Sequence, residues 1–229
     1  MDNKLAEFEN VIGYSFTNKE LLKTALTHTS YVNENKSLDC EDNEMFEFFG
    51  DAIIEFHVSE YLFRNKKEFP EGDMTKIRAS MVCEQSLAIC ARTISLGSYI
   101  FMGKGEDASG GRGRASITSD AFEALVAAIY LDSGRDSAEK FIEEHLINVL
   151  KEKDLFFDAK TRLQEYVQKS GSNNLHYELI SEDGPSHNRE FEIAAYINGT
   201  EIGRGRGHSK KAAQQEAALM AINSIRHTK

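Results

Sequence analysis

Acidic side chains recur at helical spacing between residues 44 and 55. Because an α-helix turns by about 100° per residue, one narrow stripe of such a helix carries Glu44, Glu47, Asp51 and Glu55. Like charges one turn apart repel by about 0.2–0.5 kcal/mol per pair, and a bound divalent cation would offset that repulsion. A solvated acidic face explains the same spacing without a ligand, so the stripe alone leaves both interpretations open.

A second acidic pair, Asp120 and Glu123, opens an apolar segment that is predicted to be a buried helix from about residue 119 to 131. Asp120 near the N-cap and Glu123 three residues later fit helix capping, which is compatible with metal ligation. If the two acidic helices meet, their carboxylates can share an ion. Oxygen ligands alone favour Mg²⁺ or Mn²⁺ over Zn²⁺.

Aromatic residues fill the remainder of the first acidic helix. Phe46, Phe49, Ile53 and Phe56 fall opposite the carboxylates and are predicted to form its core face. Phe48 projects beside the carboxylates instead. An exposed aromatic at that position predicts a covering partner chain.

The elements around these acids are predicted to be helical up to about residue 153. The acidic helix should end near Asn65, and Asp73 should cap a helix whose apolar spacing continues to Leu96. Glu71, in the turn between them, is either solvated or functional. Residues 103–114 are glycine-rich and predict a mobile loop; they lack the P-loop pattern, so no nucleotide cofactor is expected.

The last 70 residues have a different pattern. One helix, three alternating runs separated by turn residues, and a final helix predict an α-β-β-β-α domain, and the Asn198-Gly199 pair predicts a hairpin. Lys210 and Lys211 fall in the first turn of the final helix, where the helix dipole disfavours cations. Contact with phosphate explains them, and so does solubility.

Charge is divided unequally along the chain. The net charge is −10, yet residues 160–229 hold 10 basic and 8 acidic side chains, whereas residues 1–159 hold 17 and 29. An acidic body can bind a polyanion when cations occupy its carboxylates and a second module supplies positive charge. No apolar run is long enough for a membrane span, and the three cysteines, without a CxxC pair, predict reduced, mostly buried thiols. We therefore expect a cytoplasmic protein that does not bind membranes.

Several blocks together resemble bacterial ribonuclease III. The block N-E-M-F-E-F-F-G-D at residues 43–51 is similar to the signature helix of that family, and T-H-T-S-Y, P-E-G-D-M and S-D-A-F-E-A-L resemble further blocks in the same order. Residues 161–226 resemble a double-stranded RNA-binding domain. The resemblance implies an all-α endonuclease domain at residues 1–151, a linker at 152–159 and a small α+β domain at 160–229. Met45, Phe46 and Phe49 depart from the usual signature and imply local repacking.

The resemblance also assigns residues to roles. The metal-binding carboxylates match Glu47, Asp51, Asp120 and Glu123, and two further acids nearer the RNA match Glu44 and Glu71. Phe48 matches the aromatic that inserts into the partner of a homodimer. RNA contacts match Thr161, Gln164, Glu165, Gln168, His187, Lys210 and Lys211.

The implied activity is Mg²⁺-dependent hydrolysis of both strands of duplex RNA, with Mn²⁺ as a substitute. Two ions held by shared carboxylates would activate a water and stabilise the leaving 3′ oxygen, leaving 5′-phosphate and 3′-hydroxyl staggered ends. Processing of rRNA and mRNA is the expected role. A non-catalytic RNA-binding scaffold and a different metal phosphohydrolase are the alternatives, although a scaffold has no need of mutually repelling acids.

Overall fold

The computed structural model describes residues 2–38, 40–65, 69–152, 159–169, 171, 174–185 and 189–227. The chain divides into two compact units, Met1–Phe156 and Phe157–Lys229. Residues 153–158, which make up most of the expected linker, lie outside the described part. Each unit is described by itself below.

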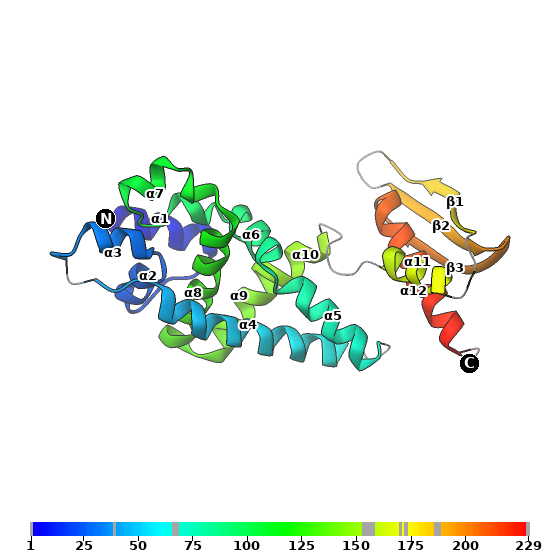
Figure 1. Ribbon diagram of the computed structural model, residues 1–229, viewed down its shortest axis with the longest axis horizontal. Coiled ribbons are helices and arrows are strands. Elements are labelled where there is room, and N and C mark those ends of the chain that lie inside the picture. The colour runs from blue at the N-terminus through cyan, green and yellow to red at the C-terminus, as the bar shows by residue number, and fades with distance from the viewer. Residues whose placement is uncertain are drawn as a thin grey trace. The chain divides into compact units, whose positions relative to one another are not determined.

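The first unit is built from helices, as the sequence predicts (Figure 1). In chain order they are α1 (Asp2–Ile12), α2 (Lys19–Ala25), α3 (Thr29–Glu34), α4 (Glu44–Asn65), α5 (Glu71–Met81), α6 (Glu84–Thr93), α7 (Lys104–Ala108), α8 (Ala115–Ser133), α9 (Arg135–Ile142) and α10 (Asn148–Glu152). Short 3₁₀ turns lie at Leu96–Ser98 and Gly111–Gly113, and a π-helical turn, Glu143–Ile147, joins α9 to α10.

The centre of this unit is α8, which packs against α2, α4, α6 and α9. It is buried on nearly every side, as its apolar sequence predicts. Its alanines, Ala121, Ala124, Ala127 and Ala128, are fully buried and let neighbouring helices approach its backbone closely. The acids of α8 are therefore held on the most enclosed helix of the unit.

Four local expectations are wrong. The helix predicted to continue to Leu96 breaks at Val82 and Cys83, and α5 begins at Glu71, so Asp73 lies inside its first turn instead of capping it. Residues 103–114 are not a plain mobile loop, because they form α7 and a 3₁₀ turn held by salt bridges from Arg112 to Asp107 and from Arg114 to Glu106. The expectation of mostly buried thiols is wrong, because Cys90 is buried but Cys40 is half-buried and Cys83 is exposed.

The predicted core face of α4 is only partly correct. Ile53 is buried, but Phe49 and Phe56 are 37% and 54% exposed. The buried stripe instead passes through Gly50, Ile53, Ile54, His57, Val58 and Leu62. The helix thus has three faces: a core face, an acidic face and an exposed aromatic face. The sequence prediction placed all the apolar residues opposite the acids and so did not separate the core face from the exposed aromatic face.

The second unit has the predicted α-β-β-β-α order: α11 (Ala159–Lys169), β1 (Leu175–Asp183), β2 (Glu190–Ile197), β3 (Thr200–Gly207) and α12 (Lys210–His227). The strands form an antiparallel sheet in the order β1-β2-β3 (Figure 1). Asn198 and Gly199, both with positive φ, form the tight turn between β2 and β3.

Glycines set the distance between β3 and α12. A Cβ at Gly203 or Gly205 would lie less than 3 Å from backbone atoms of α12. The facing positions on α12 are Ala213, Ala217 and Ala221, all fully buried. Small residues on both elements therefore let the helix lie directly on the strand.

Among the described helices, none combines the length and the apolar character that crossing a bilayer requires.

Candidate metal and RNA-binding sites

The candidate metal site is positioned by a close crossing of α4 and α8. A Cβ at Gly50 would lie 1.9 Å from the backbone carbonyl oxygen of Glu123, so only glycine allows this approach. Glu47 precedes Gly50 by one helical turn and Asp51 follows it directly. The crossing therefore brings the acids of α4 beside those of α8.

Three carboxylates converge at this crossing. Ligand oxygens of Glu47, Asp120 and Glu123 all lie within 4.8 Å of one another, and the three residues are half-buried. Asp51 is exposed at the edge of the group and acts electrostatically on Glu123. Within the described residues, none of the three clustered acids forms an ion pair with a basic side chain.

The environment disfavours three negative charges at this position. Burial, followed by the charges of Asp51, Asp120 and Glu47, raises the pKa of Glu123 to about 8. Burial is also the first cause that raises the pKa values of Glu47 and Asp120. A divalent cation would relieve both the burial cost and the mutual repulsion. An oxygen-only donor set therefore fits a hard divalent ion.

Helix capping does not explain the acids of α8. The helix begins at Ala115 with Arg114 as its N-cap residue, so Asp120 lies in the second turn and the predicted N-cap at Asp120 is wrong. Asp120 is instead contacted by the Ser119 hydroxyl, at 3.3 Å. A solvated acidic face describes Glu44, Asp51 and Glu55, which are exposed, but not the half-buried Glu47.

The two further predicted acids occupy different positions. Glu44, in the first turn of α4, raises the pKa of Glu47 through its charge. Glu71 is the first residue of α5 and accepts a hydrogen bond from the Thr75 hydroxyl. Figure 1 shows α5 beginning beside the C-terminal end of α4, whereas Glu44 and Glu47 lie near the N-terminal end. Within one chain, Glu71 is therefore not brought to the carboxylate group.

Two neighbours of Asp120 were not singled out as site residues by the sequence. Glu84, the first residue of α6, raises the pKa of Asp120, and His28 lowers it. His28 is the N-cap residue of α3 and accepts a hydrogen bond from the Ser30 amide. The sequence gives no sign that Glu84 belongs near the site, because Glu84 lies far along the chain from the acids of both α4 and α8.

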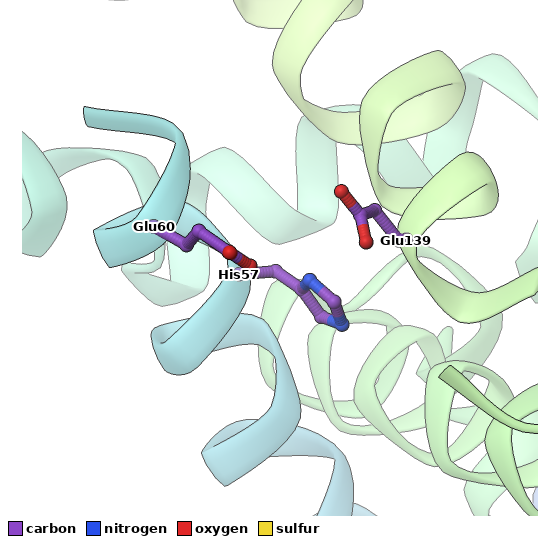
Figure 2. Close-up of side chains that lie close together, drawn as sticks. All are labelled: His57, Glu60 and Glu139. Carbon is purple, nitrogen blue, oxygen red and sulfur yellow. The ribbon is translucent and has the colours of Figure 1, made fainter. Parts of the chain in front are cut away.

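A second group, formed by His57, Glu60 and Glu139, also brings its ligand atoms within 4.8 Å of one another (Figure 2). Glu60 forms salt bridges with Arg64, at 2.5 Å, and with Arg135, which also lies 3.8 Å from Glu139. The hydrogen bond from Arg64 is the first cause that lowers the pKa of Glu60. The two arginines supply the positive charge that a metal would supply, so this group carries no metal assignment.

The predicted RNA contacts that the structure describes lie on the two helices of the second unit. Gln164, Glu165 and Gln168 are exposed on α11. Lys210 and Lys211 are exposed in the first turn of α12, which the Ser209 hydroxyl caps by accepting from the Ala212 amide at 3.0 Å. The side chain of Thr161 and the whole of His187 lie outside the described residues.

A helical unit with converging half-buried acids precedes an α-β-β-β-α unit with lysines at a helix start, an arrangement that fits a nuclease with an RNA-binding module. Residues 18–150 match the ribonuclease-III-like family, and residues 159–225 match the double-stranded RNA binding motif. The chain belongs to the ribonuclease III family, whose members are endoribonucleases.

Named relatives agree with this assignment. Ribonuclease 3 of Geobacillus kaustophilus (strain HTA426) is 45% identical over 97% of this chain and 92% of its own length. Ribonuclease 3 of Bacillus cytotoxicus is 43% identical over 96% of this chain and 90% of its own length. The nuclease domain of ribonuclease III from Campylobacter jejuni, a structure reported to show flexibility in the region involved in dimer formation, superposes with a TM-score of 0.58 at 37% identity. The superposed region covers 63% of this chain and 96% of the Campylobacter jejuni chain.

Proposed function

We propose that this endoribonuclease hydrolyses both strands of duplex RNA in a Mg²⁺-dependent reaction, with Mn²⁺ as a substitute, and leaves staggered 5′-phosphate and 3′-hydroxyl ends. The observation that carries the proposal is the convergence of Glu47, Asp120 and Glu123 within 4.8 Å without a basic partner among the described residues. The raised pKa values of these half-buried acids reflect the cost of their negative charges, which a bound divalent cation would neutralise.

In this proposal Glu47, Asp51, Asp120 and Glu123 hold the divalent ions, and Glu44 and Glu71 act nearer the RNA. Bound ions would supply Lewis-acid activation of water and stabilisation of the leaving oxygen. The chain contributes the fixed geometry of the acids, because α4 and α8 meet backbone to backbone at Gly50.

We propose further that two chains form a homodimer through the exposed aromatic face of α4. Met45, Phe48, Phe56 and Phe63 recur along this face, and Phe48 and Phe63 are 76% and 69% exposed. Exposed apolar patches of this kind mark protein contacts. The nuclease domain of the Campylobacter jejuni relative is reported to have a region involved in dimer formation, which supports dimerisation of this chain.

A two-fold axis that is perpendicular to α4 and passes near the middle of this face would make the two α4 helices antiparallel. The N-terminal end of one α4 would then lie beside the C-terminal end of the other. Since Glu71 follows the C-terminal end of α4, we propose that it acts at the carboxylate group of the partner subunit. Two such sites, related by the axis, each cut one strand.

The second unit is proposed to bind duplex RNA through 2′-hydroxyl and phosphate contacts that read A-form shape. Thr161, Gln164, Glu165, Gln168 and His187 are the proposed groove contacts, and Lys210 and Lys211 the proposed phosphate contacts. We retain 1–151, 152–159 and 160–229 as the proposed nuclease domain, linker and RNA-binding domain. Processing of rRNA and mRNA in the cytoplasm is the proposed setting.

One experiment tests this function. Duplex RNA, duplex DNA and single-stranded RNA are each incubated with the protein in Mg²⁺ and again with excess chelator. We expect cleavage of duplex RNA only, abolished by the chelator, and 5′-phosphate at the new ends. Binding of duplex RNA without cleavage would leave the scaffold interpretation, and cleavage of DNA would indicate a different phosphohydrolase.

The matched variants are Glu123→Gln and Glu55→Gln. Each removes one acid from an acidic segment that the sequence singles out, Glu55 from α4 and Glu123 from α8, but only Glu123 belongs to the convergent group. Glu123→Gln should slow cleavage by more than about a hundredfold, since even outer-shell losses at metal sites cost about 10–100-fold. Glu55→Gln should cleave at the unaltered rate. Equal rates for the two variants would contradict the site.

A further inference from the structure

A polar contact joins the two helices of the second unit. The backbone amide of Lys160, in the first turn of α11, donates to Gln215 Oε1 on α12 at 3.1 Å. Lys160 Nζ donates to Gln214 Oε1 at 2.8 Å and lies 5.1 Å from the ring centroid of Tyr177 on β1. One lysine therefore joins α11, α12 and β1.

These hydrogen bonds fix how α11 is oriented against α12, which apolar packing alone does not. The buried residues of α12 are mostly alanines, and they share one apolar core cluster with Leu163 and Val167 of α11. Apolar contact is non-directional, whereas a hydrogen bond fixes both distance and angle. The Gln215 amide also satisfies one of the amides that a helix start leaves without an intrahelical partner.

The contacts lie one helical turn from the proposed RNA-binding positions on both helices. Gln214 and Gln215 follow Lys210 and Lys211 by four residues, which places each glutamine one turn below a lysine. Lys160 precedes Gln164 on α11 by the same interval. The contact therefore ties together the two helix starts whose outer positions face the RNA.

A rigid duplex fixes the distance between the groups that bind it. A double-stranded RNA-binding domain contacts two successive minor grooves and the phosphates between them, so its two helices must keep one separation. We propose that Lys160, Gln214 and Gln215 form a clamp that sets the separation of α11 and α12 for duplex recognition. They are positioning residues, and the inference rests on the proposed RNA contacts of these helices.

The test compares long and short duplexes. Binding to the full chain is measured in chelator, which prevents cleavage, with one duplex of about 20 base pairs and one of about 8, because the domain spans about 16. Gln215→Met keeps the side-chain length and removes the acceptor. Gln85→Met, at an exposed position on α6 in the first unit, is the matched control. Gln214→Met provides a second, independent break.

We expect Gln215→Met and Gln214→Met each to raise Kd for the long duplex about three- to tenfold, as for loss of one hydrogen bond. Kd for the short duplex should change by less than about twofold, since it engages one helix at a time, and Gln85→Met should change neither. Thermal unfolding confirms that the variants are folded at the temperature of the assay.

Equal weakening on both duplexes would show that the glutamines only stabilise the domain and would overturn the clamp. An unchanged Kd for the long duplex would overturn it as well. Failure of the unaltered chain to bind either duplex would instead overturn the proposed function, so the two failures are distinguishable.

Discussion

The two units of this chain display their functional groups in opposite ways. The first unit collects carboxylates from α4 and α8 into a half-buried group that burial and repulsion make costly. The second exposes side-chain amides and lysines on the outer positions of α11 and α12, where solvent reaches them. The first site therefore depends on where two helices cross, and the second depends on the distances between exposed side chains of α11 and α12.

The largest expected effect tests whether the first site spans two chains. A dimer of one Glu71→Gln chain and one Glu123→Gln chain would carry both changes in one site if Glu71 acts in the partner, leaving the other site intact. We therefore expect nicked duplex RNA, detected by comparing native and denaturing gels. The control is a dimer in which both chains carry Glu123→Gln, and it should cut neither strand. Complete loss of cleavage in the mixed dimer would show that Glu71 acts within its own chain.

Next in size is the effect of Gly50→Ala. The added methyl would collide with the backbone at Glu123, and overpacking of this kind costs about 1–3 kcal/mol. Denaturant unfolding of the first unit should show that loss, and cleavage should fall while affinity for duplex RNA in chelator stays unchanged.

The control for Gly50→Ala is Gly72→Ala, also within a helix, where a Cβ meets nothing within 4 Å. Removing a helical glycine there should stabilise by up to about 1 kcal/mol. Similar losses at the two positions would refute the close crossing as the cause.

A smaller effect is expected from Lys211→Ala in the second unit. Loss of one phosphate contact should lower the slope of log affinity against log salt by about 0.7 to 0.9, while the cleavage rate at saturating RNA stays the same. Lys140→Ala, an exposed lysine on α9, is the control and should leave the slope unchanged. A lower cleavage rate at saturating RNA would contradict a role for Lys211 in binding alone.

The smallest effect concerns pH. The pKa of Glu123 is raised from 4.5 to about 8, so the folded protein binds the extra proton between these values. The stability associated with that proton is fully present below about pH 4.5 and is lost as the pH rises through about 8. In chelator, Glu123→Gln should therefore unfold a few degrees above the unaltered protein at pH 9 and at nearly the same temperature at pH 5.

Added Mg²⁺ should reverse this order at pH 9, because only the ionised carboxylate binds the ion and ligand binding stabilises the folded state. Thermal scans with and without Mg²⁺ measure both effects. A Glu123→Gln variant that unfolds below the unaltered protein in chelator at pH 9 would contradict the raised pKa.

Much of the fold was predictable because its elements carry local signals. Helical periodicity located α4 to its end at Asn65, and the Asn198-Gly199 turn and the alternating runs predicted the strands of the second unit. Boundaries set by tertiary contacts were not predictable. The residues 103–114 look mobile in sequence, yet Arg112 reaches back to the carbonyls of Gly97 and Ile100 and orders them.

The sequence by itself determined which acids lie on α4 and α8, the order of elements in the second unit, and the lysines at the start of α12, because helix periodicity and turn chemistry are properties of short segments. Only the tertiary structure decided that Glu47, Asp120 and Glu123 converge while Glu71 lies at the far end of α4, and that Phe49 and Phe56 face outward. The physical reason is that a residue's burial and pKa depend on which backbone crosses it. Here that crossing is the contact at Gly50, between segments more than 70 positions apart in the chain.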